Sequence, residues 1–233
     1  IDCPPVNAID SNNWLNLFHI INDLSEDQSV NVIVITASGK GFCGGADKSE
    51  TRDEIESIPI LMDHLWKAAR AIHMCNVPVI SACHGYVLGA GAFIPASGDF
   101  ILASKDAYFG FPGINFKVVV GGAHMTRLFP LNVVRRMILT GESLSADEAF
   151  KYGAINSIHD TKKDLYKEAL KLAEIIANKD RKSLVLAKKS FDFEEVVQQS
   201  AQISFERDSK SSFTLDTYAY TKNLPYTLYI HIR

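Results

Sequence analysis

The sequence has little of what marks several common classes of protein. It holds four cysteines in 233 residues, none of them in a Cys-x-x-Cys pair, and its seven histidines complete no zinc-binding spacing. No apolar run reaches the ~20 residues of a transmembrane helix. The chain opens on Ile1, without a methionine or the basic and apolar segments of a secretory leader. We therefore expect reduced thiols, no metal site, and a cytoplasmic protein whose chain begins part-way through a longer gene product.

An excess of charge is also missing. The chain carries 24 lysines and arginines against 27 aspartates and glutamates, a formal net charge of −3. That balance argues against nucleic acid or a membrane surface as a partner. The hydrophobic fraction is 47% and the charged fraction is 22%, which is ordinary for a globular protein. A chain of this length can bury a sizeable core without disulfides or metals, so we expect one large domain or one domain with an appendage.

Hydrophobic patterning predicts an α/β fold. Two β-branched runs, at residues 30–37 and 77–83, are typical of strands buried on both faces. The amphipathic helix predicted between them, over residues 58–75, completes a β-α-β unit. Further short strands are predicted at 100–103, 107–109 and 155–158, and further helices at 12–24, 133–139, 145–152, 164–177 and 184–197.

The same patterning predicts the domain organisation and some helix starts. We expect an α/β core over residues 1–180 and a helical C-terminal region over 181–233, although its last part, from Thr214, fits no clear pattern. Ser11 or Asn12 is expected to cap the first helix. The segment Ser145–Glu148 reads as a capping box at the start of a later helix.

Each of the two long strands runs into a glycine-rich loop, the first at Gly39–Asp47 and the second at His84–Ala92. Ligands in open α/β sheets bind beyond the carboxyl ends of the strands, so both loops lie where a site is expected. A helix starting near Ala90 would aim unbonded N–H groups at an anion. The plainer interpretation is a pair of tight turns. Neither loop matches a phosphate-binding loop or a dinucleotide fingerprint, and the chain has no Gly-x-Ser-x-Gly motif.

The loops and their neighbours resemble a known family. The segment Phe42-Cys43-Gly44-Gly45-Ala46-Asp47 is similar to the Phe-x-x-Gly-Ala-Asp loop of the crotonase, or enoyl-CoA hydratase/isomerase, superfamily. Residues 76–82 followed by 85–91 resemble its second signature. Segments at 5–9, 97–103, 107–112, 139–141 and 149–156 continue the resemblance in register, which spans residues 4 to about 207.

This resemblance implies a fold, a ligand and a set of site residues. The fold is the ClpP/crotonase fold of repeated ββα units, with a helical C-terminal trimerisation region and a homotrimer or hexamer as the assembly. The ligand is an acyl-CoA thioester, with no cofactor beyond the coenzyme A of the substrate. Backbone N–H groups matching Ala46 and Ala90 would form an oxyanion hole for a thioester enolate. Lys40 and the backbone at Gly44, Ala46 and Lys48 match positions that line the CoA nucleotide.

The sequence departs from the family where proton transfer is expected. The two glutamates of the hydratases correspond to Phe93 and Gly113, and neither of these residues carries a titratable proton. His124, in a glycine-rich segment that matches a pocket-lining helix start, is the candidate replacement, although a structural histidine is the plainer interpretation. Asn115 and Lys117 follow the second missing acid and are weaker candidates.

Other polar residues of the two loops have plainer explanations. His64 and Cys43 are expected to be packing residues, and Asp47 is expected to cap the backbone of its own loop. Serine proteases of the Clp type share this fold at a distance and place a nucleophilic serine at the second loop. This chain has Leu88-Gly89-Ala90-Gly91 there, without a serine, so protease chemistry is excluded.

Three functions remain open at this point. The first is an acyl-CoA enzyme that uses the oxyanion hole without the two glutamates, for decarboxylation or for a lyase or isomerase step. The second is a non-catalytic acyl-CoA-binding protein or an assembly partner of an active relative. The third is an enoyl-CoA hydratase with residual activity supplied by another residue.

Overall fold

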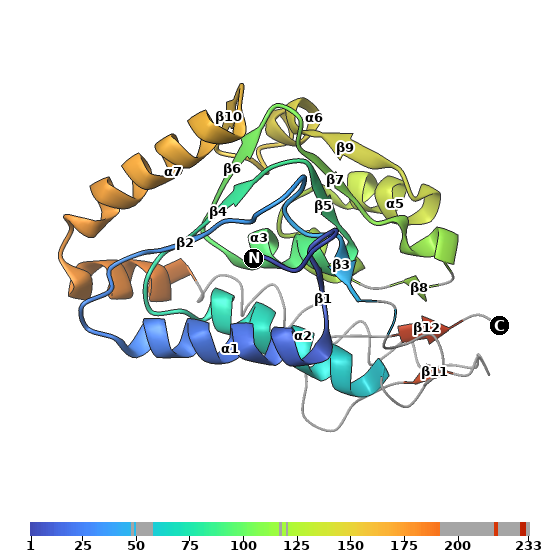
Figure 1. Cartoon of the computed structure of the whole chain (residues 1–233), viewed down its shortest axis with the longest axis horizontal. Coiled ribbons are helices and arrows are strands. Elements are labelled where there is room, and N and C mark those ends of the chain that lie inside the picture. The colour runs from blue at the N-terminus through green and yellow to red at the C-terminus, as the bar shows by residue number, and fades with distance from the viewer. Residues whose placement is uncertain are drawn as a thin grey trace.

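The computed structural model describes residues 1–47, 49, 58–116, 118–119, 121–191, 217–218 and 229–231. A four-stranded parallel sheet lies at its centre, in the order β10-β6-β4-β2 (Figure 1). Its strands are β2 (Ile33–Ile35), β4 (Val79–Cys83), β6 (Phe100–Ser104) and β10 (Ser157–His159). Every residue of β4 is buried, as its β-branched and apolar composition predicts for a central parallel strand.

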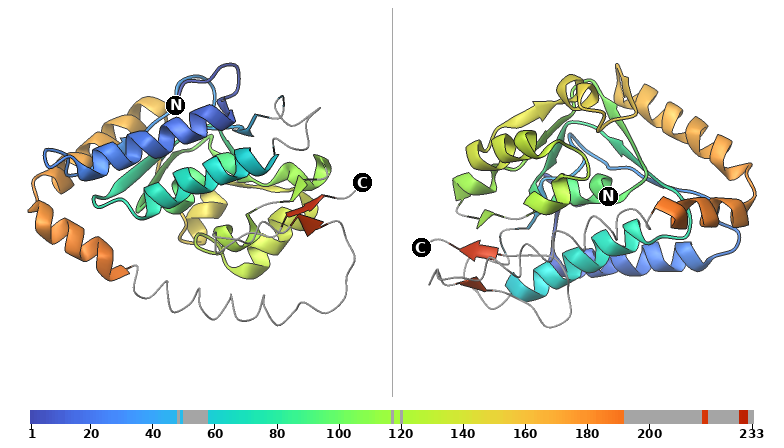
Figure 2. Two further views of the ribbon diagram at one scale, coloured as in Figure 1. Left: turned by 90° about the horizontal axis from the view of Figure 1, so that it is seen from below. Right: turned by 180° about the vertical axis from the view of Figure 1, so that it is seen from behind.

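Helices pack on the central sheet because alternate side chains of its strands project to opposite faces. Ile80 and Ala82 of β4 join a cluster with Leu165 and Ala169 of helix α7 (Lys162–Ala177). Val79 and Cys83 belong instead to the larger core cluster. That cluster includes buried residues of α1 (Ser11–Glu26) and α2 (Ile58–His73), which lie side by side (Figure 2).

Three of the central strands, β2, β4 and β6, are each followed by a short strand outside the central sheet, and this alternation makes the repeat. Strands β5 (Tyr86–Leu88), β7 (Tyr108–Gly110) and β9 (Ser143–Ser145) form a sheet in that order. Strands β1 (Ala8–Ile9) and β3 (Gly45–Ala46) form a separate parallel pair. After β5 the chain enters a 3₁₀ helix, η3 (Gly89–Ala92), and then α3 (Phe93–Ser97). The ββα repetition expected from the resemblance is thus present.

Of two helix starts predicted from the sequence, the structure confirms one and corrects the other. The remaining elements are η4 (Pro112–Phe116), β8 (Val118–Val119), α4 (Gly122–Met125), α5 (Leu131–Thr140) and α6 (Ala146–Lys151). Ser145 and Glu148 form the expected capping box at the start of α6. The expected cap of α1 is wrong by one or two residues, because Asp10, not Ser11 or Asn12, accepts a hydrogen bond from the Asn13 amide.

The C-terminal region needs a correction. Residues 181–191 are helical as expected, while the rest of the helix predicted at 184–197 lies outside the described residues. The expectation that residues 181–233 are helical is wrong at β11 (Thr217–Tyr218) and β12 (Tyr229–His231). These two strands pair antiparallel with each other, and β12 pairs with β8. β-branched and aromatic residues favour strands, and the inter-strand hydrogen bonds to β8 supply the partners that a lone segment would lack.

Candidate active site

The two glycine-rich loops lie directly against each other. The Cys43 amide donates to the Tyr86 carbonyl at 3.1 Å, and the Leu88 amide donates to the Cys43 carbonyl at 2.9 Å. A Cβ atom added to Gly45, whose φ is +109°, would lie 3.1 Å from the Leu88 carbonyl oxygen. A Cβ atom added to Gly91 would lie 2.6 Å from Cβ of Cys43. The glycines at these positions therefore allow a backbone-to-backbone approach that a side chain would obstruct.

The amides of Ala46 and Ala90 lie on the two adjoining segments. The Asp47 amide donates to the Ile9 carbonyl at 3.0 Å, so Asp47 faces β1. Because successive peptide groups of a strand point to opposite edges, the Ala46 N–H is directed away from β1. Ala90 is the second residue of η3, where an N–H has no acceptor within the helix. Neither amide is therefore used by the element that positions it.

Phe93 fills the space in which the resemblance places the first glutamate of the hydratases. Its side chain is completely buried and stacks on Trp66, with ring centroids 5.2 Å apart. A Cβ atom added to Gly121, whose φ is +84°, would lie 2.2 Å from Cε1 of Phe93. The ring is packed closely on several sides, so this position is a hydrophobic wall and contributes no acid or base.

His124 lies beside this wall. It is half-buried on α4 and makes edge contacts with the rings of Phe93 and Trp66, at centroid distances of 5.0 and 5.5 Å. Its Nε2 is hydrogen-bonded to Oγ of Ser97 at 3.0 Å. Ser97 is 1% exposed and ends α3, the helix that Phe93 begins. The aromatic contacts and the hydrogen bond to Ser97 therefore help to set the ring orientation of His124.

The position of the second missing acid, Gly113, lies in a short turn. Gly113 lies in η4, and Asn115 of the same turn is exposed. The Asn115 amide nitrogen lies 2.7 Å from the point where a Cβ atom on Gly141 would stand, so this side chain packs at the end of α5. Lys117 and Lys48, two further residues expected at the site, lie outside the described residues.

Side chains from other parts of the chain donate hydrogen bonds to the backbone of the turn that carries Lys40. Lys40 itself is exposed. The carbonyl of Gly39 accepts hydrogen bonds from Nε2 of His84 and from Nζ of Lys162, each at 3.1 Å. The hydroxyl of Tyr166 donates to the Ala37 carbonyl. His84 is in the second loop, but Lys162 and Tyr166 come from α7, and no local pattern in the sequence signals their part in this turn.

Three residues interpreted as structural have structural contacts. Cys43 is completely buried and its thiol donates to the Asn7 carbonyl at 3.0 Å, while burial raises the pKa of this thiol to about 12. A thiol with so high a pKa is a poor nucleophile at neutral pH. His64 bonds Oγ of Ser11 through Nδ1 at 2.9 Å. The Asp47 carboxylate accepts from the Ser49 amide at 2.9 Å and so caps its own loop, as expected.

Neither a metal-binding cluster nor a membrane-spanning helix occurs in the described residues. No group of three or more His, Cys, Asp or Glu side chains is placed to hold a metal ion in this part of the chain. In the same residues, no helix has both the length and the apolar character that crossing a bilayer requires.

Comparisons with known proteins agree with this architecture. The enoyl-CoA hydratase/isomerase family model matches residues 1–219. A Mycobacterium tuberculosis H37Rv protein named (7aS)-7a-methyl-1,5-dioxo-2,3,5,6,7,7a-hexahydro-1H-indene-carboxyl-CoA hydrolase is 30% identical over 210 residues, 89% of this chain and 84% of that protein. The short-chain-enoyl-CoA hydratase of Clostridium acetobutylicum is 30% identical over 182 residues, 75% of this chain and 67% of that protein.

The solved structures include an enoyl-CoA hydratase of Mycobacterium smegmatis with a TM-score of 0.78 and 28% identity, covering 90% of this chain and 86% of that one. Fold and loop geometry thus define a protein of the crotonase class. The chain belongs to the enoyl-CoA hydratase/isomerase family. Relatives within it are named both as hydratases and as a CoA hydrolase, so the family supports an acyl-CoA-processing enzyme without specifying the reaction.

Proposed function

We propose that this protein is an acyl-CoA enzyme that stabilises a thioester enolate with the backbone amides of Ala46 and Ala90. Its reaction is a decarboxylation, lyase or isomerase step and not the hydration of an enoyl-CoA. The observation that carries this proposal is the close contact between the two glycine loops beside a wall built on Phe93. Amide donors are retained at this place, whereas the carboxyl groups that hydration requires are not.

Decarboxylation fits the groups that remain. When a malonyl-type thioester loses CO2, the bond between its α-carbon and its carboxylate breaks, and that electron pair becomes the enolate. No base has to remove a proton, so the absence of both glutamates is no obstacle. Two N–H donors stabilise the oxyanion as its charge develops, and they need no reorganisation during the reaction because the fold already holds them in place. The enolate carbon then takes one proton, which completes the acyl-CoA product and balances the reaction.

His124 is the proposed source of that proton. Histidine changes charge near neutral pH, so it can deliver a proton and regain one from water. The contacts with Ser97, Phe93 and Trp66 hold the ring in one orientation, and a fixed orientation favours directed proton transfer. A structural histidine would need the same contacts, so kinetics must distinguish the two roles.

The test is a comparison of two substrates. We expect crotonyl-CoA hydration to be absent or slower by several orders of magnitude than the ~1–10³ per second of ordinary enzymes, since one positioned acid or base contributes ~10²–10⁴-fold. Malonyl-type CoA thioesters should release CO2. His124→Ala should slow that release while leaving acyl-CoA binding intact. Ordinary hydration of crotonyl-CoA, with contaminating hydratase excluded, would show that another residue supplies the acid and that this proposal is wrong.

A second candidate is acyl-CoA binding without turnover. The specific observation in its favour is the complete burial of Phe93, which leaves no titratable group at that position. Binding of acyl-CoA without release of CO2 or any other product would favour this function over the first.

The nucleotide end of the ligand is proposed to bind near Lys40 and the backbone at Gly44, Ala46 and Lys48. Lys40 is exposed and carries a point charge suited to a phosphate. Lys40→Ala should weaken acetyl-CoA binding by about 1 kcal/mol, the scale of an exposed ion pair. Calorimetry measures this directly. An unchanged affinity would mean that Lys40 is a solvated surface lysine.

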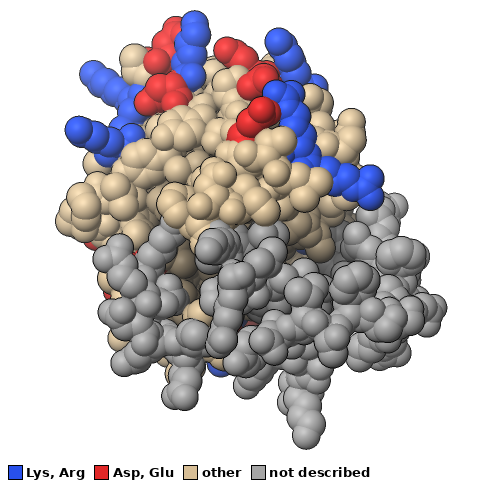
Figure 3. All heavy atoms as spheres, turned by 90° about the vertical axis from the view of Figure 1, so that its right-hand side faces the viewer, with Lys and Arg blue, Asp and Glu red and all other residues tan. Residues whose placement is uncertain are grey.

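We also propose a homotrimer or a hexamer as the assembly. Helices α5 and α6 and the residue after α6 present exposed apolar side chains, namely Leu131, Leu139, Phe150 and Tyr152. The side of the molecule on which these helices lie has charged side chains gathered at one end, above a broad uncharged band (Figure 3). Uncharged, partly apolar surface of this kind is typical of subunit contacts. Light scattering that shows only a monomer of 25.8 kDa would contradict the proposal.

A further inference from the structure

The turn at residues 37–41 is fixed by an unusual set of side chains. Nδ2 of Asn7 donates to the carbonyls of Ser38 and Gly41, at 2.8 and 2.9 Å. His84 and Lys162 both donate to the carbonyl of Gly39. Together with the hydroxyl of Tyr166 on Ala37, these donors reach four carbonyls of one short turn. The turn lies in no helix or strand, so side chains supply the partners that secondary structure would otherwise provide.

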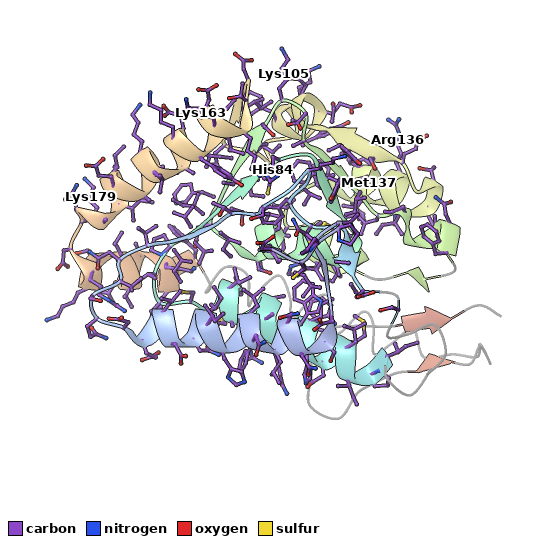
Figure 4. All side chains as sticks on the ribbon, viewed as in Figure 1. His84, Lys105, Arg136, Met137, Lys163 and Lys179 are labelled. Carbon is purple, nitrogen blue, oxygen red and sulfur yellow. The ribbon has the colours of Figure 1, made fainter. Side chains whose placement is uncertain are left out.

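His84 is the most deeply placed of these donors. It is 2% exposed, its ring contacts that of Tyr166 edge-on at 6.1 Å, and Figure 4 shows it in the interior, away from the outer side of α7. A carbonyl only accepts, so the proton lies on Nε2 and the lone pair on Nδ1. Nδ1 is buried and has no hydrogen-bond partner within the described part of the chain. An unpaired buried acceptor is costly, so packing alone does not account for a histidine here.

These hydrogen bonds orient two peptide groups. In a trans peptide the C=O and N–H point in opposite directions. Because the Gly39 carbonyl faces inward, to His84 and Lys162, the N–H of Lys40 faces outward. The Ser38 carbonyl faces Asn7, so the N–H of Gly39 likewise faces away from it. Gly39 has a φ of +73°, a left-handed conformation found where successive N–H groups form an anion-binding nest.

We propose that His84 and Lys162 are positioning residues that hold the Gly39–Lys40 peptide group so that its N–H and the Lys40 ammonium together receive the phosphates of the CoA ligand. This inference rests on the proposed function, because it takes acyl-CoA as the ligand. His84 and Lys162 do not touch the ligand themselves. They act through the orientation of one peptide group, which is why their loss should affect only ligands that carry phosphates.

The experiment compares binding of two probes, acetyl-CoA and S-acetylpantetheine, which lacks the nucleotide and its phosphates. Calorimetry is carried out on wild type, His84→Leu, His84→Gln, Lys162→Met and Lys163→Met. Lys163 is the matched control, since it is the next lysine along α7, is exposed and points away from the turn (Figure 4). His84→Gln keeps an N–H donor near the position of Nε2, so it tests whether the donor alone is sufficient.

We expect His84→Leu and Lys162→Met each to weaken acetyl-CoA binding by about tenfold, the effect of one lost hydrogen bond at the site. His84→Gln should stay within about threefold of wild type, and Lys163→Met should bind as wild type does. S-acetylpantetheine should bind all five proteins with the same affinity. This last result distinguishes a positioning role from a general disturbance of the fold, because a disturbed fold would weaken the binding of both probes equally. Lys162→Met keeps the test decisive should His84→Leu fail to fold.

Two results would overturn the inference while leaving the proposed function standing. One is acetyl-CoA affinity within twofold of wild type for both His84→Leu and Lys162→Met. The other is an equal loss of affinity for acetyl-CoA and S-acetylpantetheine in those variants. If wild type itself binds neither probe, the proposed function fails, and the inference that rests on it fails too.

Discussion

Replacement of Phe93 by alanine tests whether the wall beside the two loops is packed as the structure shows. The ring is completely buried and has three aromatic neighbours, Trp66, Phe111 and His124, at centroid distances of 5.2, 6.4 and 5.0 Å. Truncation of a buried phenylalanine to alanine costs about 3–5 kcal/mol. Aromatic pairs add about 0.5–1.5 kcal/mol beyond area burial, so we expect a loss of unfolding free energy in the upper part of that range.

Urea unfolding followed by tryptophan fluorescence is the appropriate assay, since Trp66 stacks on the ring that is removed. The unfolding midpoint should fall while the slope with urea stays constant, as expected for a pure change in stability. Phe191→Ala is the matched control, because Phe191 is 67% exposed and its loss should change stability by no more than about 0.5 kcal/mol. A loss below about 1 kcal/mol for Phe93→Ala would refute the tightly packed wall.

Two further predictions concern buried polar groups. Lys188→Met should lower the unfolding free energy by about 3 kcal/mol, because it leaves the Asp99 carboxylate without the ammonium group that lies 2.7 Å away. Replacement of the exposed neighbour, Lys189→Met, should change the unfolding free energy little. Equal effects of the two substitutions in urea unfolding would contradict this prediction. Burial lowers the pKa of His84, so the contribution of this neutral ring to stability is complete above pH ~6.5, the pKa of an unfolded histidine, and is lost progressively as pH falls below that value. Between pH 7.5 and 5.5 wild type should therefore lose more unfolding free energy than His84→Gln, although the charge of Asp106 partly opposes the lowering of the His84 pKa. Equal losses of unfolding free energy in the two proteins would contradict a buried neutral ring.

Elements with strong local signals were predicted well from the sequence. The buried run at Val79–Cys83 is a central strand, and the Ser145 capping box starts its helix as expected. The run at residues 30–37 also contains a strand, but only Ile33–Ile35 pairs with β4, although β4 continues past this pairing to Cys83. Hydrophobic patterning thus identifies an element, whereas its ends are decided by which neighbours are available.

The candidate site was predicted only where it is carried by consecutive residues. The two glycine loops and the positions of Phe93 and Gly113 follow from short segments of sequence. The hydrogen bond between Ser97 and His124 joins residues 27 apart, and that between Lys162 and Gly39 joins residues 123 apart. No periodicity or motif encodes such pairs, because they depend on how α3, α4 and α7 pack in the folded protein.

A crystal structure of the protein with an acyl-CoA bound would show directly whether Ala46 and Ala90 form an oxyanion hole. We expect the thioester oxygen to accept hydrogen bonds from the amides of both Ala46 and Ala90, at the ~2.7–3.1 Å typical of an oxyanion hole. We also expect the α-carbon to face His124 and the wall built on Phe93. A bound thioester whose oxygen contacts neither amide would show that these amides do not form an oxyanion hole.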